Sequence, residues 1–196
     1  MFDIKLGHDG RIDRFKARLV ARGNKQSDND FDETFAPVFR LDSLRILMAI
    51  AVQYGLIAHQ LDAKNAFVGS DLDKPNCMEI PEGLQEFDSD ANGGELVLEL
   101  LKSLYGLRQS ANLQHRKISS FLEKLGFKPT TADTSVFINK RGLIIAVYID
   151  NIIIFRRNIK DIEIVKAKLK ELHPITNSSL VKKLLGIRFI WNSGSV

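Results

Sequence analysis

The hydrophobic and polar positions of this chain follow two different periods. Apolar residues recur every three or four positions in three segments, which predicts amphipathic helices over residues 41–55, 110–126 and 159–173. In the first of these segments, Asp42 or Ser43 is expected to cap the start and Gly55 to end the helix. The segment 87–94, rich in Asp, Asn and Gly, is expected to be a loop.

Other segments show the alternation or the short apolar runs that are typical of strands. In residues 14–22, Arg14, Lys16 and Arg18 fall on one face and apolar side chains on the other, which predicts a half-buried strand with a cationic outer face. Further strands are expected at the start of 56–67 and over 134–139, 143–149 and 152–156. Helices and strands do not alternate regularly, so we expect an α+β fold with helices packed on one face of a mainly antiparallel sheet.

The most apolar stretch, "RGLIIAVYIDNIIIFRR" at residues 141–157, is interrupted by Asp150 and Asn151. A hairpin turn is one interpretation, since Asp and Asn are favoured in turns. A rigid site that presents a carboxylate to a hard cation is the other. Asp62 has a similar position at the end of a predicted strand. Two such carboxylates on neighbouring strands can hold a pair of divalent ions for phosphoryl transfer, although two aspartates alone leave both interpretations open.

Composition excludes several classes of protein. Among the 196 residues, Cys77 is the single cysteine, which excludes an internal disulfide and a cysteine-rich zinc site. The four histidines lack the spacing of metal ligands. The longest apolar run is too short for a membrane span, so we expect no membrane partner.

The formal net charge of +4 is unevenly distributed. Residues 11–25 hold six basic side chains and one acid, and residues 101–128 hold the same numbers. Residues 71–99 hold nine acids and one lysine. Segregated basic segments suit a protein that binds a polyanion, while solvated faces of ordinary helices and strands are the alternative.

Five motifs carry a family resemblance. They are "KARLVARGN", "DETFAPVFRLDSLRILMAIAVQYGLIAHQLDAKNAFVGSDL", "MEIPEG", "SLYGLRQS" and "VYIDN", in that order. The chain from Lys16 to Ile187 thereby resembles the reverse transcriptase domain of copia-type (Pseudoviridae-like) LTR retrotransposon polyproteins. The resemblance implies a polymerase of fingers and palm that copies RNA into DNA with two Mg²⁺ ions, or Mn²⁺ in their place. It implies a palm with a ferredoxin-like (RRM-like) antiparallel sheet backed by helices.

The resemblance also implies how the chain is divided. We expect residues 1–196 to form one reverse transcriptase fingers and palm domain. Fingers-like segments are expected over about 1–55 and 70–105, and palm segments over about 56–69 and 106–190. The thumb and RNase H regions of the family are expected to lie outside this chain.

Three positions are implied as the catalytic site. Asp62 matches the first catalytic aspartate of the family, and Asp150 matches the third residue of its Tyr-x-Asp-Asp signature. Both are the implied metal ligands. Asn151 stands where that signature has its last aspartate, so the chain has two carboxylates in place of three. An amide carries no charge, and ions held by fewer charges bind more weakly.

Five further positions are implied as nucleotide-binding residues. Lys16 and Arg18 match a fingers strand that contacts the triphosphate, and Phe67 matches the aromatic residue that screens the sugar 2′ position. Arg108 and Gln109 match a basic residue and a glutamine near the nucleotide and the template.

The departures from the family pattern predict weak polymerase activity or none. Besides Asn151, residues 111–114 read Ala-Asn-Leu-Gln where the family has Pro-Arg-x-Trp. The alternatives are a palm remnant that binds nucleic acid without catalysis and a relic fragment without function. The implied partners are an RNA template with a DNA primer, deoxynucleoside triphosphates, and the integrase and RNase H of the same polyprotein. The implied location is the cytoplasm, with the nucleus as the alternative.

Overall fold

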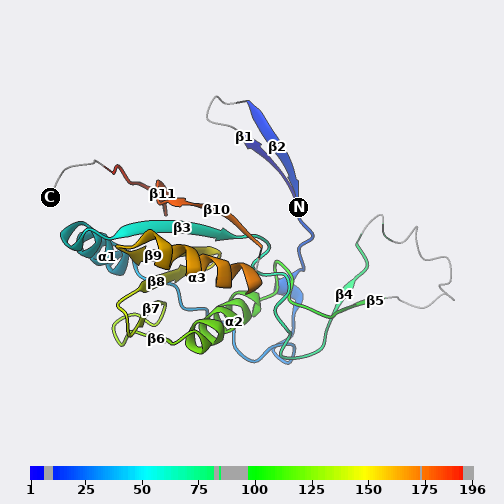
Figure 1. Ribbon diagram of the computed structural model, residues 1–196. Helices are drawn as coiled ribbons and strands as arrows, with labels where there is room; N and C mark the ends of the chain where they lie inside the picture. Colours follow the sequence, from blue (N-terminus) through cyan, green and yellow to red (C-terminus); the bar gives the residue numbers. More distant parts are fainter. Residues whose placement is uncertain (7–10, 82–83, 85–96, 173, 192–196) are drawn as a thin grey trace. The chain divides into compact units, whose positions relative to one another are not determined.

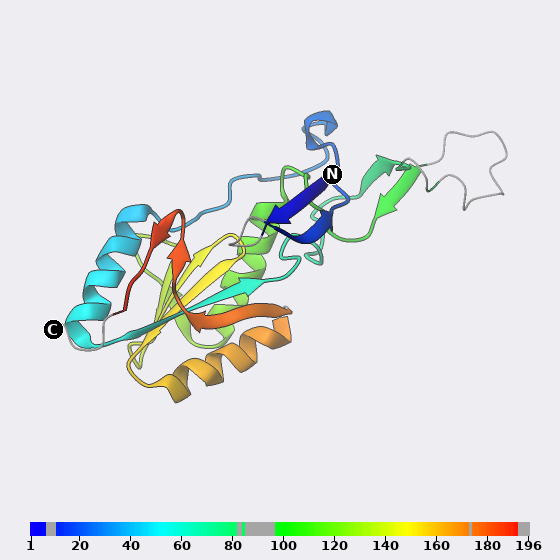
Figure 2. The same ribbon diagram turned by 90° about the horizontal axis from the view of Figure 1, so that it is seen from above.

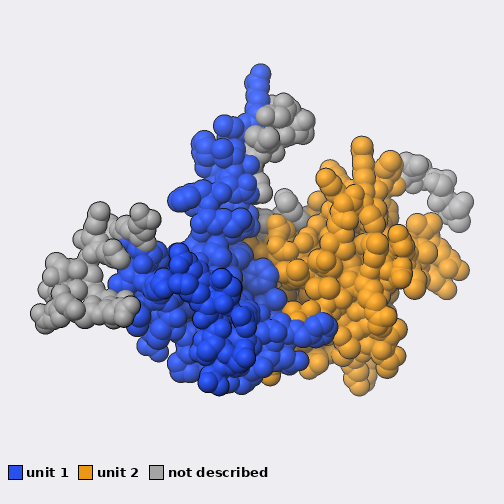
Figure 3. Space-filling view, turned by 180° about the vertical axis from the view of Figure 1, so that it is seen from behind, with its two compact units in different colours: residues 1–35, 67–113 blue, residues 36–66, 114–196 orange. Residues whose placement is uncertain are grey.

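The computed structural model describes residues 1–6, 11–81, 84, 97–172 and 174–191. The chain forms two compact units. Unit 1 comprises residues 1–35 and 67–113, and unit 2 comprises residues 36–66 and 114–196 (Figure 3). The expected loop at 87–94 lies outside the described residues. This division places residues 36–55 with the expected palm segments, and the assignment of fingers and palm stays a prediction.

A sheet of six antiparallel strands forms the centre of unit 2 (Figure 1). Its spatial order is β10-β3-β9-β8-β7-β6. The strands are β3 (Ile57–Ala63), β6 (Phe127–Pro129), β7 (Val136–Asn139), β8 (Ile144–Tyr148), β9 (Asn151–Arg156) and β10 (Ile175–Leu180). A two-stranded ladder of β11 (Lys183–Leu184) and β12 (Ile187–Arg188) completes the unit. The mixture of helices and antiparallel strands confirms the α+β class.

Both faces of this sheet are covered. One face packs against α2 (Ser110–Lys124) and α3 (Ile159–Leu172), with Ile145, Ile152 and Ile154 in the shared core. The other face packs against α1 (Leu41–Tyr54), with Ile153 and Phe155 in a second core. Figure 2 shows α1 and α3 on opposite sides of β3. The prediction that helices cover one face was therefore wrong.

The apolar run of β8 and β9 explains this difference. Almost every residue of these two strands is buried, at successive positions as well as at alternating ones. Successive side chains of a strand point to opposite faces, so both faces of these strands are apolar and both need a cover. The carboxyl end of β8 then turns directly into β9, and the polar residues 150 and 151 lie at that turn.

The three helices confirm the predicted periodicity. Their inward stripes are buried as expected, including Leu44 and Leu47 in α1 and Ile118 and Leu122 in α2. Gly55 ends α1 in the left-handed conformation, with φ 60°, and its N–H bonds back to the carbonyls of the last turn.

The predicted cap of α1 was wrong. Arg40 occupies the N-cap position and makes no side-chain capping bond. Asp42 instead forms an exposed ion pair with Arg45 at 3.1 Å. The capping oxygen comes from a distant residue, Asp133, whose Oδ2 accepts hydrogen bonds from the Arg40 backbone N–H at 2.9 Å and the Ser43 hydroxyl at 2.6 Å.

The described residues of unit 1 form two antiparallel strand pairs. One pairs β1 (Phe2–Leu6) with β2 (Ile12–Ala17), and the other pairs β4 (Asn76–Glu79) with β5 (Val97–Leu100). The short 3₁₀ helix η1 (Gly23–Lys25) also lies in this unit. The predicted strand over 14–22 was wrong in extent and burial, because β2 ends at Ala17 and Phe15 is 76% exposed. Strand β1 pairs with β2 through its backbone, but the apolar faces of both strands stay exposed.

A close backbone contact holds the segments around residues 21 and 106 together. The Ala21 N–H donates to the Tyr105 carbonyl at 2.7 Å. Gly106 has φ 92°, and a Cβ at this residue would lie 2.1 Å from the Ala21 carbonyl oxygen. A Cβ at Gly23 would lie 2.0 Å from the Gly106 carbonyl oxygen. Glycine is therefore required at both positions because a Cβ has no room there. At Gly106 the positive φ is a second reason.

Candidate functional site

The turn between β8 and β9 presents Asp150. Tyr148 and Asn151 are direct partners across the hairpin, so Ile149 and Asp150 form a two-residue loop. Ile149 has φ 56°, a conformation that is unusual for a β-branched residue and is normally occupied by glycine in such turns. Strain of this kind is found where surrounding structure fixes a functional turn.

Strand β3 brings Asp62 to the same end of the sheet. Asp62 is the direct partner of Asn151 on β9, and the Ala63 N–H donates to the Asp150 carbonyl at 2.9 Å. On its other side, Asp62 is in register with Thr176 of β10. Direct partners in antiparallel strands have Cα atoms about 4.5–5.5 Å apart. The structure therefore brings together Asp62, Asp150 and Asn151, each half-buried.

A chain of side-chain hydrogen bonds links the polar groups at this end. Gln60 Nε2 donates to Asn151 Oδ1 at 2.8 Å, and Asn151 Nδ2 donates to Asp150 Oδ1 at 2.9 Å. Gln60 and Asp62 are two positions apart on β3, so both side chains lie on one face of the sheet. That is the α1 face, because Ile153, the direct partner of Gln60, belongs to the α1 core.

The donor set fits a hard divalent cation only in part. Two carboxylates at neighbouring strand ends supply the oxygen ligands that Mg²⁺ and Mn²⁺ prefer. The third position does not fit, because the Asn151 amide directs its NH₂ group at Asp150. Among the residues that the structure describes, no group of three or more His, Cys, Asp or Glu side chains could hold a metal ion.

The five candidate nucleotide-binding residues all lie in unit 1. Arg18 and Phe67 both contact the ring of Tyr105: the guanidinium carbon of Arg18 is 5.2 Å from the ring centroid, and the Phe67 ring meets it edge-on at 5.4 Å. Lys16 lies on β2 in register with Asp3. The structure thus groups two of the five residues around an aromatic ring that the sequence prediction missed.

Arg108 and Gln109 anchor a loop of unit 1. Arg108 Nε donates to the Gly23 carbonyl at 2.8 Å, and its backbone N–H donates to Gln26 Oε1 at 2.8 Å. Gln109 is completely buried. Its Oε1 accepts from Gln26 Nε2 at 3.1 Å, and its Nε2 donates to the Asp30 carbonyl at 3.3 Å. Both polar atoms of Gln109 are therefore bonded within the protein.

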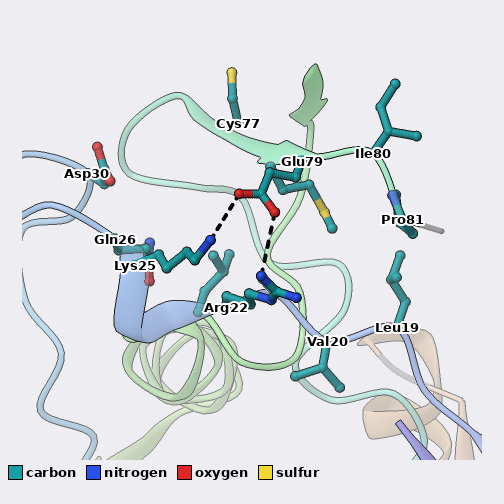
Figure 4. A pocket seen from close by; sticks show the side chains of 13 residues that line it. Leu19, Val20, Arg22, Lys25, Gln26, Asp30, Cys77, Glu79, Ile80 and Pro81 are labelled. Carbon is teal, nitrogen blue, oxygen red and sulfur yellow. Dashed lines mark hydrogen bonds and ion pairs between the residues drawn. The ribbon is translucent and has the colours of Figure 1, made fainter. Parts of the chain in front are cut away.

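A pocket of about 350 Å³ also lies in unit 1, and none of the candidate site residues lines it (Figure 4). Glu79 is one of the residues that line it, and it accepts a hydrogen bond from Lys25 Nζ at 3.1 Å, with Arg22 Nη1 at 3.6 Å. The hydrogen bond from Lys25, the charge of Lys25 and then that of Arg22 lower the pKa of Glu79 below its ordinary value. Leu19, Val20 and Ile80 supply apolar walls.

Two residues at the carboxylate end were also missed by the sequence prediction. Gln60 could have been found, because a polar residue two positions before Asp62 on a predicted strand shares its face. Ile149 could not, since nothing in the sequence indicates a positive φ at an isoleucine.

Of the helices that the structure describes, none is long and apolar enough to cross a membrane.

Comparison with known proteins supports the resemblance seen in the motifs. Residues 2–196 match the family model described as "Reverse transcriptase (RNA-dependent DNA polymerase)". The chain is 31% identical to the retrovirus-related Pol polyprotein from transposon TNT 1-94 of Nicotiana tabacum, over 97% of this chain and 14% of that protein. It is 37% identical to the corresponding polyprotein from transposon RE1 of Arabidopsis thaliana, over 79% of this chain and 10% of that protein.

A putative transposon Ty5-1 protein of Saccharomyces cerevisiae is 28% identical over 65% of this chain and 41% of that protein. No solved structure matches the chain. The chain thus spans between a tenth and a seventh of the length of the two plant polyproteins. It belongs to the reverse transcriptase (RNA-dependent DNA polymerase) family, and its relatives include copia-type Pol polyproteins of plant and yeast transposons.

Proposed function

We propose that this chain is the polymerase domain of a retrotransposon polyprotein and catalyses RNA-directed DNA synthesis by two-metal nucleotidyl transfer. We propose further that Asn151 weakens this activity strongly. The observation that carries the proposal is the meeting of Asp62 and Asp150 at one end of neighbouring strands, within a chain of this family. Fold alone would not suffice, since function depends on the site.

Phosphoryl transfer depends mainly on positioning and on compensation of negative charge. Asp62 and Asp150 would hold the Mg²⁺ or Mn²⁺ ions, which when bound stabilise the attacking and leaving oxygens. The protein contributes rigidity at this point. Asp62 is paired with strands on both sides, and Asp150 is fixed by the hairpin and by the Ala63 N–H. Asp62 lies within a regular strand, where a ligand keeps its geometry better than on a loop.

The residues of unit 1 would serve the incoming nucleotide. Lys16, Arg18 and Arg108 supply positive charge for a triphosphate, and Phe67 supplies a flat apolar surface beside the sugar. Gln109 would act by holding the loop that carries Arg108, because its own polar atoms bond to Gln26 and to the Asp30 carbonyl. The partners would be an RNA template with a DNA primer, deoxynucleoside triphosphates, and the integrase and RNase H of the same polyprotein, in the cytoplasm.

A second candidate function is binding of nucleic acid without catalysis. The amide at position 151 favours it, since the site has two carboxylates and a hydrogen-bond donor in place of three carboxylates. A relic that folds poorly would expose apolar sheet surface. The six-stranded sheet of unit 2 is covered on both faces, which argues against this alternative for that unit.

Primer extension on an RNA template, with Mg²⁺ and separately with Mn²⁺, tests the proposal. The natural chain, Asn151→Asp and Asp62→Ala are compared, and binding of the template–primer is measured for each by fluorescence anisotropy. We expect Asn151→Asp to raise the extension rate by about tenfold or more, because each 1.4 kcal/mol of transition-state stabilisation is a factor of ten. We expect Asp62→Ala to abolish extension and to leave duplex binding unchanged.

The possible outcomes separate the two candidate functions. If Asn151→Asp leaves the rate unchanged while the natural chain extends the primer, the role of this amide is refuted. If no variant extends the primer but all bind the duplex, the binding function replaces the polymerase function.

A further inference from the structure

The side chain of Asn151 is fixed at both ends by the two hydrogen bonds described above. Its oxygen accepts from Gln60, and its NH₂ group donates to Asp150. In this series of hydrogen bonds the direction of donation is the same throughout: Gln60 donates to Asn151, and Asn151 donates to Asp150. We propose that Gln60 is a positioning residue that keeps the Asn151 amide in this direction and so prevents it from serving as a cation ligand.

The direction matters because the two ends of an amide have opposite chemistry. The oxygen can accept a hydrogen bond or coordinate a cation, whereas the NH₂ group can only donate. With its oxygen bonded to Gln60, Asn151 offers only N–H groups toward Asp150. A cation that approaches Asp150 Oδ1 would meet these hydrogens and would have to compete with them for the same oxygen.

Asn151 cannot reverse alone. If it turned, its NH₂ group would face the NH₂ group of Gln60, and its oxygen would face the Asp150 carboxylate. Both contacts are repulsive, and each leaves a half-buried polar group without a partner. If Gln60 turned as well, the first conflict would disappear, but the oxygen of Asn151 would still face a carboxylate. A cation between these two oxygens would remove that second conflict, so coordination of a cation by the Asn151 oxygen requires both amides to reverse together.

This inference rests on the proposed function only in so far as Asp62 and Asp150 hold the cation. It explains why an amide, which has an oxygen ligand to offer, still fails to replace the missing carboxylate. It also predicts that the direction can be changed from position 60. Gln60→Glu supplies only acceptors there, so the Asn151 NH₂ group should turn toward it and the Asn151 oxygen toward the cation.

The experiment measures binding of Mn²⁺ to the intact chain by electron paramagnetic resonance, with the Asp62→Ala variant giving the background. We expect Gln60→Glu to tighten Mn²⁺ binding roughly three- to tenfold, the factor that corresponds to one side-chain hydrogen bond. Gln60→Met, which lacks any hydrogen-bond donor, should tighten it less. Gln53→Met, an exposed glutamine of α1, is the matched control and should have no effect.

The added charge of Gln60→Glu needs its own control. In the Asn151→Ala background, Gln60→Glu has no amide to reverse. If Gln60→Glu tightens binding as much in this background as in the natural chain, charge alone explains the gain and the inference is overturned. If Gln60→Glu no longer tightens Mn²⁺ binding in this background, the tighter binding in the natural chain depends on the Asn151 amide.

A second measurement is independent of the metal. In the metal-free chain, the side-chain NH₂ resonances of Asn151 in a ¹⁵N–¹H spectrum should shift in Gln60→Met and in Asp150→Ala, because each removes one partner. Unchanged resonances in both variants would refute the hydrogen-bond chain. Failure of Asn151→Asp to bind Mn²⁺ would instead refute the metal site of the proposed function, so the two failures can be told apart.

Discussion

Two histidines of unit 2, His59 and His115, have pKa values lowered by their surroundings. His59 Nδ1 lies 2.7 Å from Lys166 Nζ, and the Lys166 side chain is almost fully buried. Burial, and then the charge of Lys166, lower the pKa of His59, while Glu163 opposes this effect. Burial lowers the pKa of His115, whose ring nitrogens face the hydroxyls of Ser119 and Ser135. Both rings therefore bind a proton less readily in the folded protein than in the unfolded chain.

This difference predicts how stability depends on pH. Between the folded pKa and the ordinary value of 6.5, the unfolded chain binds more protons, so stability is full above pH 6.5 and falls as the pH decreases through this window. We expect a loss of about 1 kcal/mol between pH 7.5 and 5.5, since solvent screens the partly exposed rings. Urea unfolding at the two pH values measures it. The double variant His59→Gln/His115→Gln should lose most of the dependence, and an unchanged dependence would refute the assignment.

At the scale of elements, the start of α1 depends on a residue from another segment. Asp133 is 7% exposed, and its carboxylate accepts three hydrogen bonds: two at the start of α1, and one from the Ser135 N–H at 3.1 Å. An aspartate that accepts several hydrogen bonds from backbone groups ties the two segments together. It also compensates the positive end of the helix dipole.

Removal of this carboxylate should weaken unit 2. We expect Asp133→Ala to lower the free energy of unfolding by about 2–4 kcal/mol, because it leaves one buried and two partly buried donors without an acceptor. Asp133→Asn, which keeps one acceptor, should have a smaller effect. Asp42→Ala is the control, since Asp42 forms only an exposed ion pair and such pairs contribute less than about 1 kcal/mol. Equal losses in urea unfolding for Asp133→Ala and Asp42→Ala would contradict the capping role.

At the scale of the whole molecule, the net charge of +4 is concentrated in basic segments. If the chain binds a template–primer, its cations replace counterions along the phosphate backbone. We therefore expect affinity for an RNA–DNA hybrid to fall by about 10²–10³ between 50 and 200 mM salt, as for four to six phosphate contacts. Fluorescence anisotropy measures this.

Charge reversal tests where those contacts lie. Arg14→Glu, in the basic segment 11–25, should reduce the salt dependence, whereas Lys160→Glu at the start of α3 should not. Affinity that does not change with salt would exclude a polyanion as the partner. Equal effects of the two variants would exclude a specific role for the basic segment.

The sequence by itself determined the helices and the ends of the sheet strands where the two candidate aspartates lie. Apolar stripes at a period of 3.6 predicted α1, α2 and α3, because the burial pattern of a helix depends on residues within one short segment. The motifs identified the family, Asp62 was correctly expected at the end of a strand, and Asp150 lies in the hairpin turn that was one interpretation of its position. A polar interruption of an apolar run is likewise a local signal.

Only the tertiary structure decided the rest, because the relevant partners are distant in sequence. The sheet order β10-β3-β9-β8-β7-β6 and the cover on both of its faces depend on pairing between separate segments. The cap of α1 comes from Asp133, 93 residues after the Arg40 N–H that it accepts. The direction of the Asn151 amide is set by Gln60, 91 residues away. Local periodicity shows which side chains turn inward, but the hydrogen bonds they form there are determined only when remote segments pack together.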